Sequence, residues 1–326
     1  MPRLVPALVG LALLLTAALV PADARAGSGN VVIVLNSGED TISILDQTTM
    51  TEVARVPAGR EPHHLMPTPV GRELIIANAR SNDMIFVDPR KGGEIRRLRG
   101  IADPYQIGFS PDGKWFVSNS LRLDRVDVYD AQTYERVARF RGLSTPSHMS
   151  FSADSRYVFV SLQDSGELAA IDLTTKEVAW KVAVGPGAAG VLTTEDDRFV
   201  YVGIMGSDYV SVVDWRERKV VDRIRTGRGA HNVFPIPGDK RNVLVSNRLS
   251  SNVSIVDTET RQVVRQIPVP GGPDCLVFNA DGSQIWVTGR WSHKVYVVDM
   301  RTFQVLRSIP VGRSPHGIYL HVDPTS

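Results

Sequence analysis

The chain has 326 residues, a formal net charge of +2 and a single cysteine, Cys275. One cysteine excludes an internal disulfide, a C-x-x-C-H haem attachment and a zinc site built from several thiolates. The near-neutral charge argues against a general nucleic-acid-binding protein, which usually carries a strongly basic domain. Cys275 lies in an apolar stretch, and this favours a buried, unreactive thiol.

The first 26 residues have the features of an export signal. Arg3 provides a basic start, residues 8–20 form an apolar run, and Ala24-Arg25-Ala26 matches an A-x-A cleavage site. The run is shorter than the roughly 20 residues that a spanning helix needs, and no other long apolar run follows. We therefore expect a signal peptide over 1–26 and a mature protein without a membrane span, either periplasmic or secreted.

Seven copies of one short pattern recur through the rest of the chain. Each copy is an apolar pair that ends in aspartate and leads into a polar turn; the aspartates are Asp46, Asp88, Asp130, Asp172, Asp214, Asp257 and Asp299. Successive positions differ by 42 or 43 residues. A period of about 40–45 residues with short strands is typical of a β-propeller blade. The sequence therefore predicts an all-β, seven-bladed β-propeller over residues 27–326.

The sixth repeat illustrates the expected antiparallel blade. Its four strands are predicted at 275–279, 284–288, 294–298 and 303–309, separated by turns rich in Asp, Gly and Ser. The repeated aspartate closes the third strand. We expect its carboxylate to accept backbone amides of the next turn, rather than to act in catalysis.

The two ends of the chain are expected to share one blade. The repeats begin at 31–35 with a second-position strand and end at 316–320 with a first-position strand that has no successors. Pairing these segments would close the ring and remove an exposed sheet edge.

The repeated motifs resemble the YVTN β-propeller family. They include Pro315-His316-Gly317, Ser110-Pro111-Asp112-Gly113 and the second strands Ile75-Ile76-Ala77-Asn78, Phe116-Val117-Ser118-Asn119 and Leu244-Val245-Ser246-Asn247. The resemblance covers residues 27–326 and implies an exported bacterial or archaeal propeller. The pattern is also similar to the propellers of d1-haem nitrite reductases and their maturation relatives. Those usually have eight blades, whereas this chain has seven repeats.

Five of the seven histidines fall near the start of an expected innermost strand. His63, His231 and His316 begin this strand in three repeats, and His64 and His148 lie one residue further on. In a propeller, innermost strands begin on one face, around the central channel. We call this face the mouth; binding sites generally belong to loops that converge on such a face.

Arginines follow the same face. Seven lie in the blade-to-blade connectors or in the loops between second and third strands: Arg60, Arg80, Arg122, Arg228, Arg248, Arg290 and Arg313. Guanidinium groups suit carboxylates and phosphates, and a cluster of them raises the local concentration of an anion. We therefore expect this arginine- and histidine-rich mouth to bind an anionic small molecule or another exported protein.

Two other interpretations of the histidines remain open. The Pro-His-Gly motif recurs as scaffold in this repeat family, and the imidazole can satisfy backbone groups at the strand start. Alternatively, imidazoles from several blades could hold a metal ion or a d1-type haem iron, and the propeller would then have a redox or cofactor-maturation role. His63 and His316 begin adjacent blades, but His231 comes from across the ring, and His63 and His64 should alternate sides of a strand. We therefore predict no metal or cofactor, with either one as the alternative.

No complete catalytic motif is present. Residues 185–190 match G-x-G-x-x-G, but the stretch that follows does not have the helical context that a dinucleotide site needs. A P-loop and a G-x-S-x-G elbow are both missing. The sequence therefore favours a monomeric, non-enzymatic binding protein over an enzyme.

Overall fold

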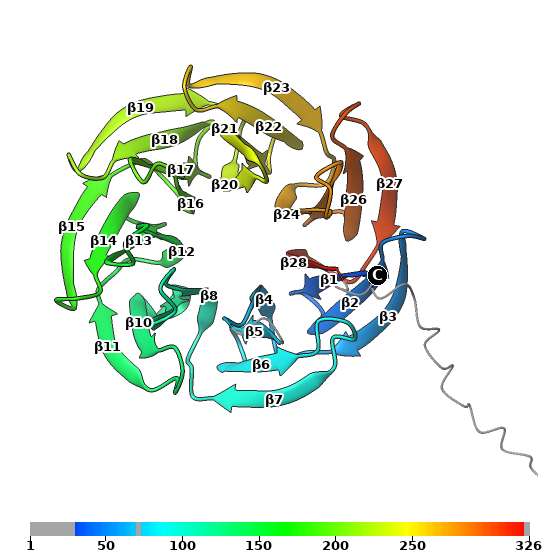
Figure 1. The fold of residues 1–326 in the computed structure, drawn as a ribbon, viewed down its shortest axis with the longest axis horizontal. Helices are drawn as coiled ribbons and strands as arrows, with labels where there is room; N and C mark the ends of the chain where they lie inside the picture. Colours follow the sequence, from blue (N-terminus) through cyan, green and yellow to red (C-terminus); the bar gives the residue numbers. More distant parts are fainter. Residues whose placement is uncertain (1–29, 70–72, 323–326) are drawn as a thin grey trace, which may run out of the picture.

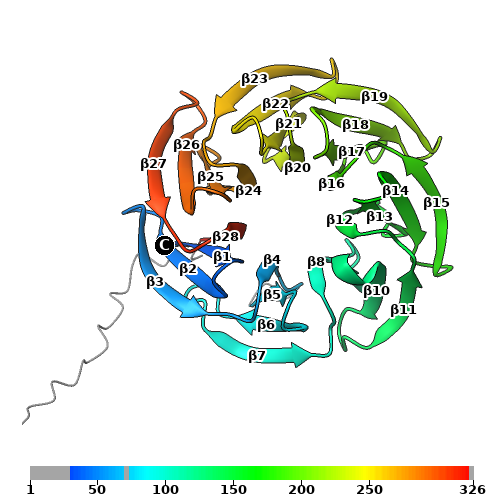
Figure 2. The same cartoon turned by 180° about the vertical axis from the view of Figure 1, so that it is seen from behind.

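A computed structural model describes residues 30–69 and 73–322, in which seven four-stranded antiparallel sheets are arranged in a ring about a central axis (Figure 1). The predicted seven-bladed propeller is therefore confirmed. The view from behind shows the same closed ring (Figure 2). The expected signal peptide lies outside the described residues and stays a prediction.

The four strands of each blade follow one another from the channel to the outer rim. Blade one is β28 (Pro315–His321), β1 (Val31–Asn36), β2 (Thr41–Asp46) and β3 (Thr51–Pro57). Blade two is β4 (Pro62–Pro67), β5 (Leu74–Asn78), β6 (Asp83–Val87) and β7 (Glu94–Arg99). Blade three is β8 (Pro104–Phe109), β9 (Trp115–Ser120), β10 (Arg125–Asp130) and β11 (Arg136–Arg141), with a 3₁₀ turn, η1 (Leu121–Leu123). Blade four is β12 (Pro146–Phe151), β13 (Tyr157–Leu162), β14 (Glu167–Asp172) and β15 (Glu177–Ala183). Blade five is β16 (Ala188–Thr193), β17 (Phe199–Ile204), β18 (Tyr209–Asp214) and β19 (Lys219–Arg225). Blade six is β20 (Ala230–Ile236), β21 (Asp239–Asn247), β22 (Asn252–Asp257) and β23 (Gln262–Pro268). Blade seven is β24 (Pro273–Phe278), β25 (Gln284–Gly289), β26 (Lys294–Asp299) and β27 (Val305–Pro310).

Burial follows the position of a strand within its blade. The middle strands, such as β1, are buried along their whole length because neighbouring blades cover both faces. The outermost strand β3 alternates between exposed and half-buried residues. Innermost strands such as β12 and β24 are buried where they begin and half-exposed where they end. Side chains therefore fill the channel at the mouth end of the ring.

The repeated aspartates have the predicted structural role. Asp46 Oδ1 accepts the amides of Thr48 and Thr49 at 2.9 and 2.7 Å. The equivalent aspartates of the other six blades also accept turn amides. In blade seven the outermost strand begins two residues later than expected, at Val305, because Phe303 has a left-handed backbone (φ 60°) and belongs to the turn.

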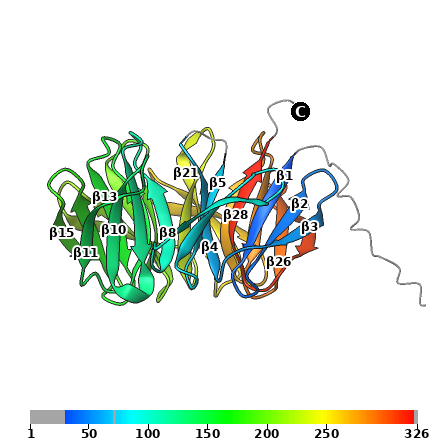
Figure 3. The ribbon, with the colours of Figure 1, turned by 90° about the horizontal axis from the view of Figure 1, so that it is seen from below.

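The chain ends close blade one as predicted. Val31 of β1 pairs with His321 of β28, and Val34 pairs with Ile318. The side view shows these terminal strands lying together, with the strands running between the two faces of the ring (Figure 3).

Every innermost strand contains a β-bulge near the mouth. Pro62 of β4 pairs with Asn78 of β5, and the next paired residues are Leu65 and Ile76. Two residues of β4 therefore lie between these pairs, against one residue of β5. The same kind of irregularity occurs at the start of the innermost strand in the other six blades. A bulge places two residues opposite one and redirects their side chains. Its recurrence in all seven blades makes it a feature of the repeat.

Within the described residues, η1 is the only helix, and none is long and apolar enough to cross a membrane. This agrees with the expected lack of a membrane-spanning helix.

Closure by β28 gives a first prediction. Truncation after Pro310 removes β28 and exposes β1, so the free energy of unfolding should fall by several kcal/mol, because one buried aliphatic side chain contributes about 1.5–3 kcal/mol. Urea unfolding followed by tryptophan fluorescence measures this. Truncation after Val322 is the control, since it leaves β28 complete. Equal unfolding midpoints for the two truncations would contradict the closure.

Candidate functional site

The five predicted histidines meet in one cluster at the mouth end of the channel. They come from four blades: His63 and His64 from β4, His148 from β12, His231 from β20 and His316 from β28. Four of the side chains are almost fully buried, with at most 2% exposed, and His64 is half-buried. We call these five residues the histidine cluster. His293 and His321 lie outside it.

The bulges explain why two consecutive residues enter the channel. We expected His63 and His64 to alternate sides of β4, and this expectation is wrong. Their Nδ1 atoms lie 2.9 Å apart, because the bulge between Pro62 and Leu65 breaks the alternation. Each innermost strand therefore has two consecutive bulge residues, and we call their positions the first and the second level. His63, His231 and His316 occupy the first level, and His64 and His148 occupy the second.

The imidazoles contact one another across the channel. The ring centroids of His63 and His316 are 3.7 Å apart, and those of His64 and His316 are 4.7 Å apart. His64 continues to His148 at 5.2 Å, and His148 to His231 at 5.1 Å. His231, expected to lie across the ring, therefore joins the cluster through His148.

Backbone carbonyls fix two of the imidazole tautomers. His316 Nδ1 lies 2.8 Å from the carbonyl oxygen of His63, and His64 Nδ1 lies 2.8 Å from that of Tyr105. A carbonyl only accepts, so both Nδ1 atoms carry the proton and both Nε2 atoms carry a lone pair. The close approach of β28 to the His63 carbonyl requires glycine at position 317, because a Cβ added there would lie 2.7 Å from the carbonyl oxygen.

A buried aspartate borders the cluster. Asp274 occupies the first-level position of β24 and has no exposed surface. Its Oδ2 accepts from Arg248 at 2.6 Å and from Arg290 at 3.3 Å. Its Oδ1 lies 3.2 Å from His231 Nδ1, within ion-pair distance but without hydrogen-bond geometry. Two guanidinium groups therefore compensate the negative charge of this carboxylate, and both bind the same oxygen atom, Oδ2.

Burial keeps the cluster neutral. It lowers the pKa of His63, His148, His231 and His316 well below that of a free imidazole. It lowers the pKa of His64 to about 4, against the opposing effect of the Tyr105 carbonyl. For Asp274, burial raises the pKa, but the guanidinium groups of Arg248 and Arg290 outweigh burial and bring the pKa of this carboxyl below its usual range. At neutral pH the imidazoles are uncharged and Asp274 is ionised.

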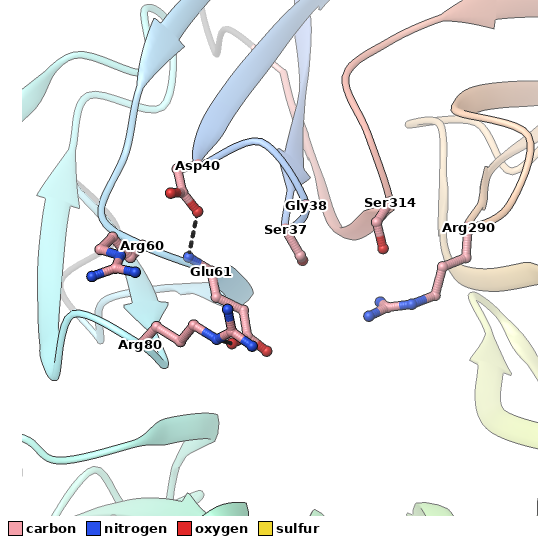
Figure 4. Close-up of a pocket in the computed structure, with 8 residues that line it drawn as sticks. All are labelled: Ser37, Gly38, Asp40, Arg60, Glu61, Arg80, Arg290 and Ser314. Atoms are coloured by element: carbon pink, nitrogen blue, oxygen red, sulfur yellow. Dashed lines mark hydrogen bonds and ion pairs between the residues drawn. The ribbon is translucent and has the colours of Figure 1, made fainter.

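The predicted arginines divide into three groups. Arg60, Arg80 and Arg290 line one cavity of about 320 Å³ at the mouth, together with Glu61 and Ser314 (Figure 4). Glu61 Oε2 pairs with Arg80 at 3.1 Å.

The remaining predicted arginines do not line this cavity. Arg122 pairs with Glu61 and with Asp103 at 2.8 and 2.6 Å, and Arg248 pairs with Asp274. Arg228 and Arg313 are exposed. The expected positive rim is thus partly neutralised by connector carboxylates.

A larger cavity of about 990 Å³ lies on the opposite face, between blades five and six. Charged side chains of both signs line it, among them Glu195, Asp196, Lys240 and Arg261, but no histidine does. Its lining includes none of the predicted site residues, so we place the candidate site at the mouth.

Sequence reasoning missed three residues of the site. Tyr105, Asp274 and Cys275 occupy the bulge positions of their innermost strands. The Tyr105 ring lies 3.9 Å from that of His63, and Cys275 Sγ lies 3.8 Å from His316 Nδ1. Alignment of the seven strand starts would have found them, had the bulge been recognised. Burial raises the pKa of the Cys275 thiol well above its ordinary value, in line with the predicted inert cysteine.

Fold and site together define a seven-bladed propeller whose channel is filled at the mouth by imidazoles. The chain belongs to the YNCE-like β-propeller family, whose family model matches residues 1–324. This confirms the predicted resemblance to a β-propeller repeat family as a matter of fold. A search of curated proteins finds no match.

Several solved structures are similar to this chain. The dihydro-haem d1 dehydrogenase NirN has 17% sequence identity and a TM-score of 0.67, with 92% of this chain and 77% of that chain covered. Hydrazine synthase from Kuenenia stuttgartiensis has 17% identity and a TM-score of 0.69, with 81% and 96% covered. A protein of unknown function from Desulfotomaculum acetoxidans has 11% identity and a TM-score of 0.77, with 90% and 100% covered. At these identities the likeness shows the fold alone, and in that sense NirN supports the resemblance to d1-haem-type propellers.

Neutral buried imidazoles predict an acid-sensitive fold. Above pH 6.5 these histidines are neutral in both folded and unfolded chains. Below it the unfolded chain binds more protons, so stability falls as pH drops towards about 4 for His64 and further for the other four. Each histidine contributes up to about 1.4 kcal/mol per pH unit. Urea unfolding in metal-free buffer at pH 7 and pH 5 should show a loss of at least about 3 kcal/mol.

Two variants test the origin of this acid sensitivity. His64→Gln should reduce the loss, and His293→Gln, which lies outside the cluster, should not. Stability that is equal at pH 7 and pH 5 in the native protein would contradict neutral, buried imidazoles.

The environment of Asp274 gives a separate prediction. Asp274→Asn leaves Arg248 and Arg290 without their carboxylate, so the free energy of unfolding should fall by about 3 kcal/mol. Asp299→Asn is the matched control in an exposed turn, where asparagine can still accept the turn amides, and it should cost less than about 1 kcal/mol. Denaturant unfolding at pH 7 compares them. If the two variants lost similar amounts of unfolding free energy, the ion pairs of Asp274 with Arg248 and Arg290 would not be important for stability.

Proposed function

We propose that this chain is an exported, non-enzymatic propeller that binds a small anionic molecule at the mouth of its channel. The observation that carries the proposal is the convergence of Arg60, Arg80 and Arg290 on one cavity. Arg60 precedes β4, Arg80 follows β5, and Arg290 comes from blade seven. Arg290 reaches the cavity from the side opposite Arg80 (Figure 4).

Three arginines and two carboxylates, Asp40 and Glu61, line this cavity, and this balance of charge favours an anion. Arg80 is paired with Glu61, and Arg290 reaches Asp274, but Arg60 makes no ion pair with any described residue. Arg80 remains exposed over 66% of its side chain, so its pairing with Glu61 leaves donors open to a ligand. A planar guanidinium can bind a carboxylate or phosphate through two parallel hydrogen bonds.

The size of the cavity favours a small ligand. About 320 Å³ lies near the lower end of the range for ligand pockets, roughly 300–1,000 Å³. A di- or tricarboxylate or a phosphate ester matches that space better than a folded protein surface does. We therefore favour a small molecule over a protein partner.

The lining of the cavity supports binding rather than catalysis. Ser37 is a possible nucleophile, but its Oγ donates to the carbonyl of Pro62 at 2.6 Å. Neither histidine nor lysine lines the cavity among the described residues, and the two carboxylates that do are already engaged: Asp40 accepts the Glu61 amide at 2.8 Å, and Glu61 pairs with Arg80 at 3.1 Å. The proposed export rests on the pattern of residues 1–26.

Calorimetric titration with citrate and with inorganic phosphate tests this function. Arg60→Ala and Arg80→Ala should each weaken binding of the preferred probe by about tenfold, because each removes a charge-assisted contact. Arg307→Ala on the outermost strand β27 removes the same charge far from the mouth and should leave affinity unchanged. Equal affinity in all three variants, or no binding of either probe, would overturn the proposal.

A further inference from the structure

We propose that His63, His64 and His316 form a binding site for one first-row transition-metal ion of the Zn²⁺ or Cu²⁺ class. One ligand nitrogen from each of the three side chains lies within 4.8 Å of the others. Imidazole is a preferred ligand of both ions. The site lies on the adjacent strands β4 and β28 and does not depend on the anion cavity.

The hydrogen bonds of this trio leave lone pairs available. The carbonyls of Tyr105 and His63 hold the protons on Nδ1 of His64 and His316, so Nε2 of each is unprotonated. Because His64 Nδ1 carries the proton that it donates to Tyr105, His63 Nδ1, 2.9 Å away, carries a lone pair rather than a second proton. A second partner that fixes the tautomer is the usual arrangement for metal-binding histidines.

One orphaned atom points to the kind of ligand that suits the cluster. His316 Nε2, which carries a lone pair, is buried without a hydrogen-bond partner among the described residues. Leaving such a group unsatisfied costs about 1–3 kcal/mol. An anion cannot satisfy a lone pair, whereas a metal ion can. This lone pair therefore distinguishes the histidine cluster from the arginine-lined cavity.

Asp274 supplies the negative charge that a divalent ion needs. Its Oδ2 lies 3.6 Å from His316 Nε2, and one ligand atom each of Asp274, Cys275 and His316 falls within the same 4.8 Å limit. The two arginines bind Oδ2, whereas Oδ1 has no hydrogen-bond partner among the described residues. The carboxylate can therefore act as a fourth ligand or as a neighbouring counter-charge.

A single ion fits this cluster better than a macrocycle. Metal–nitrogen bonds of about 2.0–2.1 Å place tetrahedral ligands about 3.4 Å apart, so ligand nitrogens that lie within 4.8 Å of one another need to approach by at most about 1.4 Å. The rings are already in contact, with centroids of His63 and His316 3.7 Å apart and those of His64 and His316 4.7 Å apart. A planar haem does not fit between them.

Titration of the metal-free protein with Zn²⁺ and with Co²⁺ tests the site. We expect one equivalent of Zn²⁺ by calorimetry and the intense visible absorption of four-coordinate Co²⁺. His64→Gln and His316→Gln should each weaken Zn²⁺ binding at least about tenfold. His293→Gln is the matched control, because this histidine lies at the mouth but outside the cluster; it should bind like the native protein.

Circular dichroism establishes which variants are folded. His64 is half-buried, so His64→Gln decides the question if His316→Gln does not fold. The proposal is overturned if the native protein binds neither ion up to about 1 mM. It is also overturned if folded His64→Gln binds with native affinity. The titrations with citrate and phosphate test only the anion site, and those with Zn²⁺ and Co²⁺ test only the metal site. Either proposal can therefore be overturned while the other stands.

Discussion

The site depends on a backbone irregularity repeated seven times. An uninterrupted innermost strand would send consecutive side chains to opposite faces, and His63 and His64 could not meet. The bulge after Pro62 turns both into the channel, and its counterparts do the same for Ser147 with His148 and for Asp274 with Cys275. The repeat thus provides two levels of inward-facing residues, and the chemistry of the channel follows from which side chains occupy them.

Electrostatics divides the mouth into two layers. The inner layer consists of neutral imidazoles, whose burial opposes protonation, beside the compensated carboxylate of Asp274. The outer layer is charged, with Arg60 and Arg80 facing solvent and connector carboxylates such as Glu61 interspersed. The inner layer offers lone pairs and the outer layer offers hydrogen-bond donors, so each suits a different kind of ligand.

The fold was predictable from sequence because every repeat carries the same local chemistry. Asp46 and its six equivalents mark the turns, and their spacing fixes the number of blades. Closure by β1 and β28 followed from counting strands. The meeting of His148 with His231 was not predictable in the same way, because it depends on the bulge and on the width of the channel. The pairing of Arg122 with Glu61 and Asp103 likewise depends on how neighbouring connectors lie in space.

The central claim is that five histidines from four blades form one largely buried, neutral cluster, in which backbone carbonyls fix the tautomers of His64 and His316. Nitrogen-15 NMR of the imidazoles across a pH titration tests it most directly. The account predicts Nδ1–H tautomers for His64 and His316, contacts between the rings of His64, His148 and His231, and protonation only well below pH 6.5. Averaged tautomers that titrate near pH 6.5, without contacts between the rings, would contradict it.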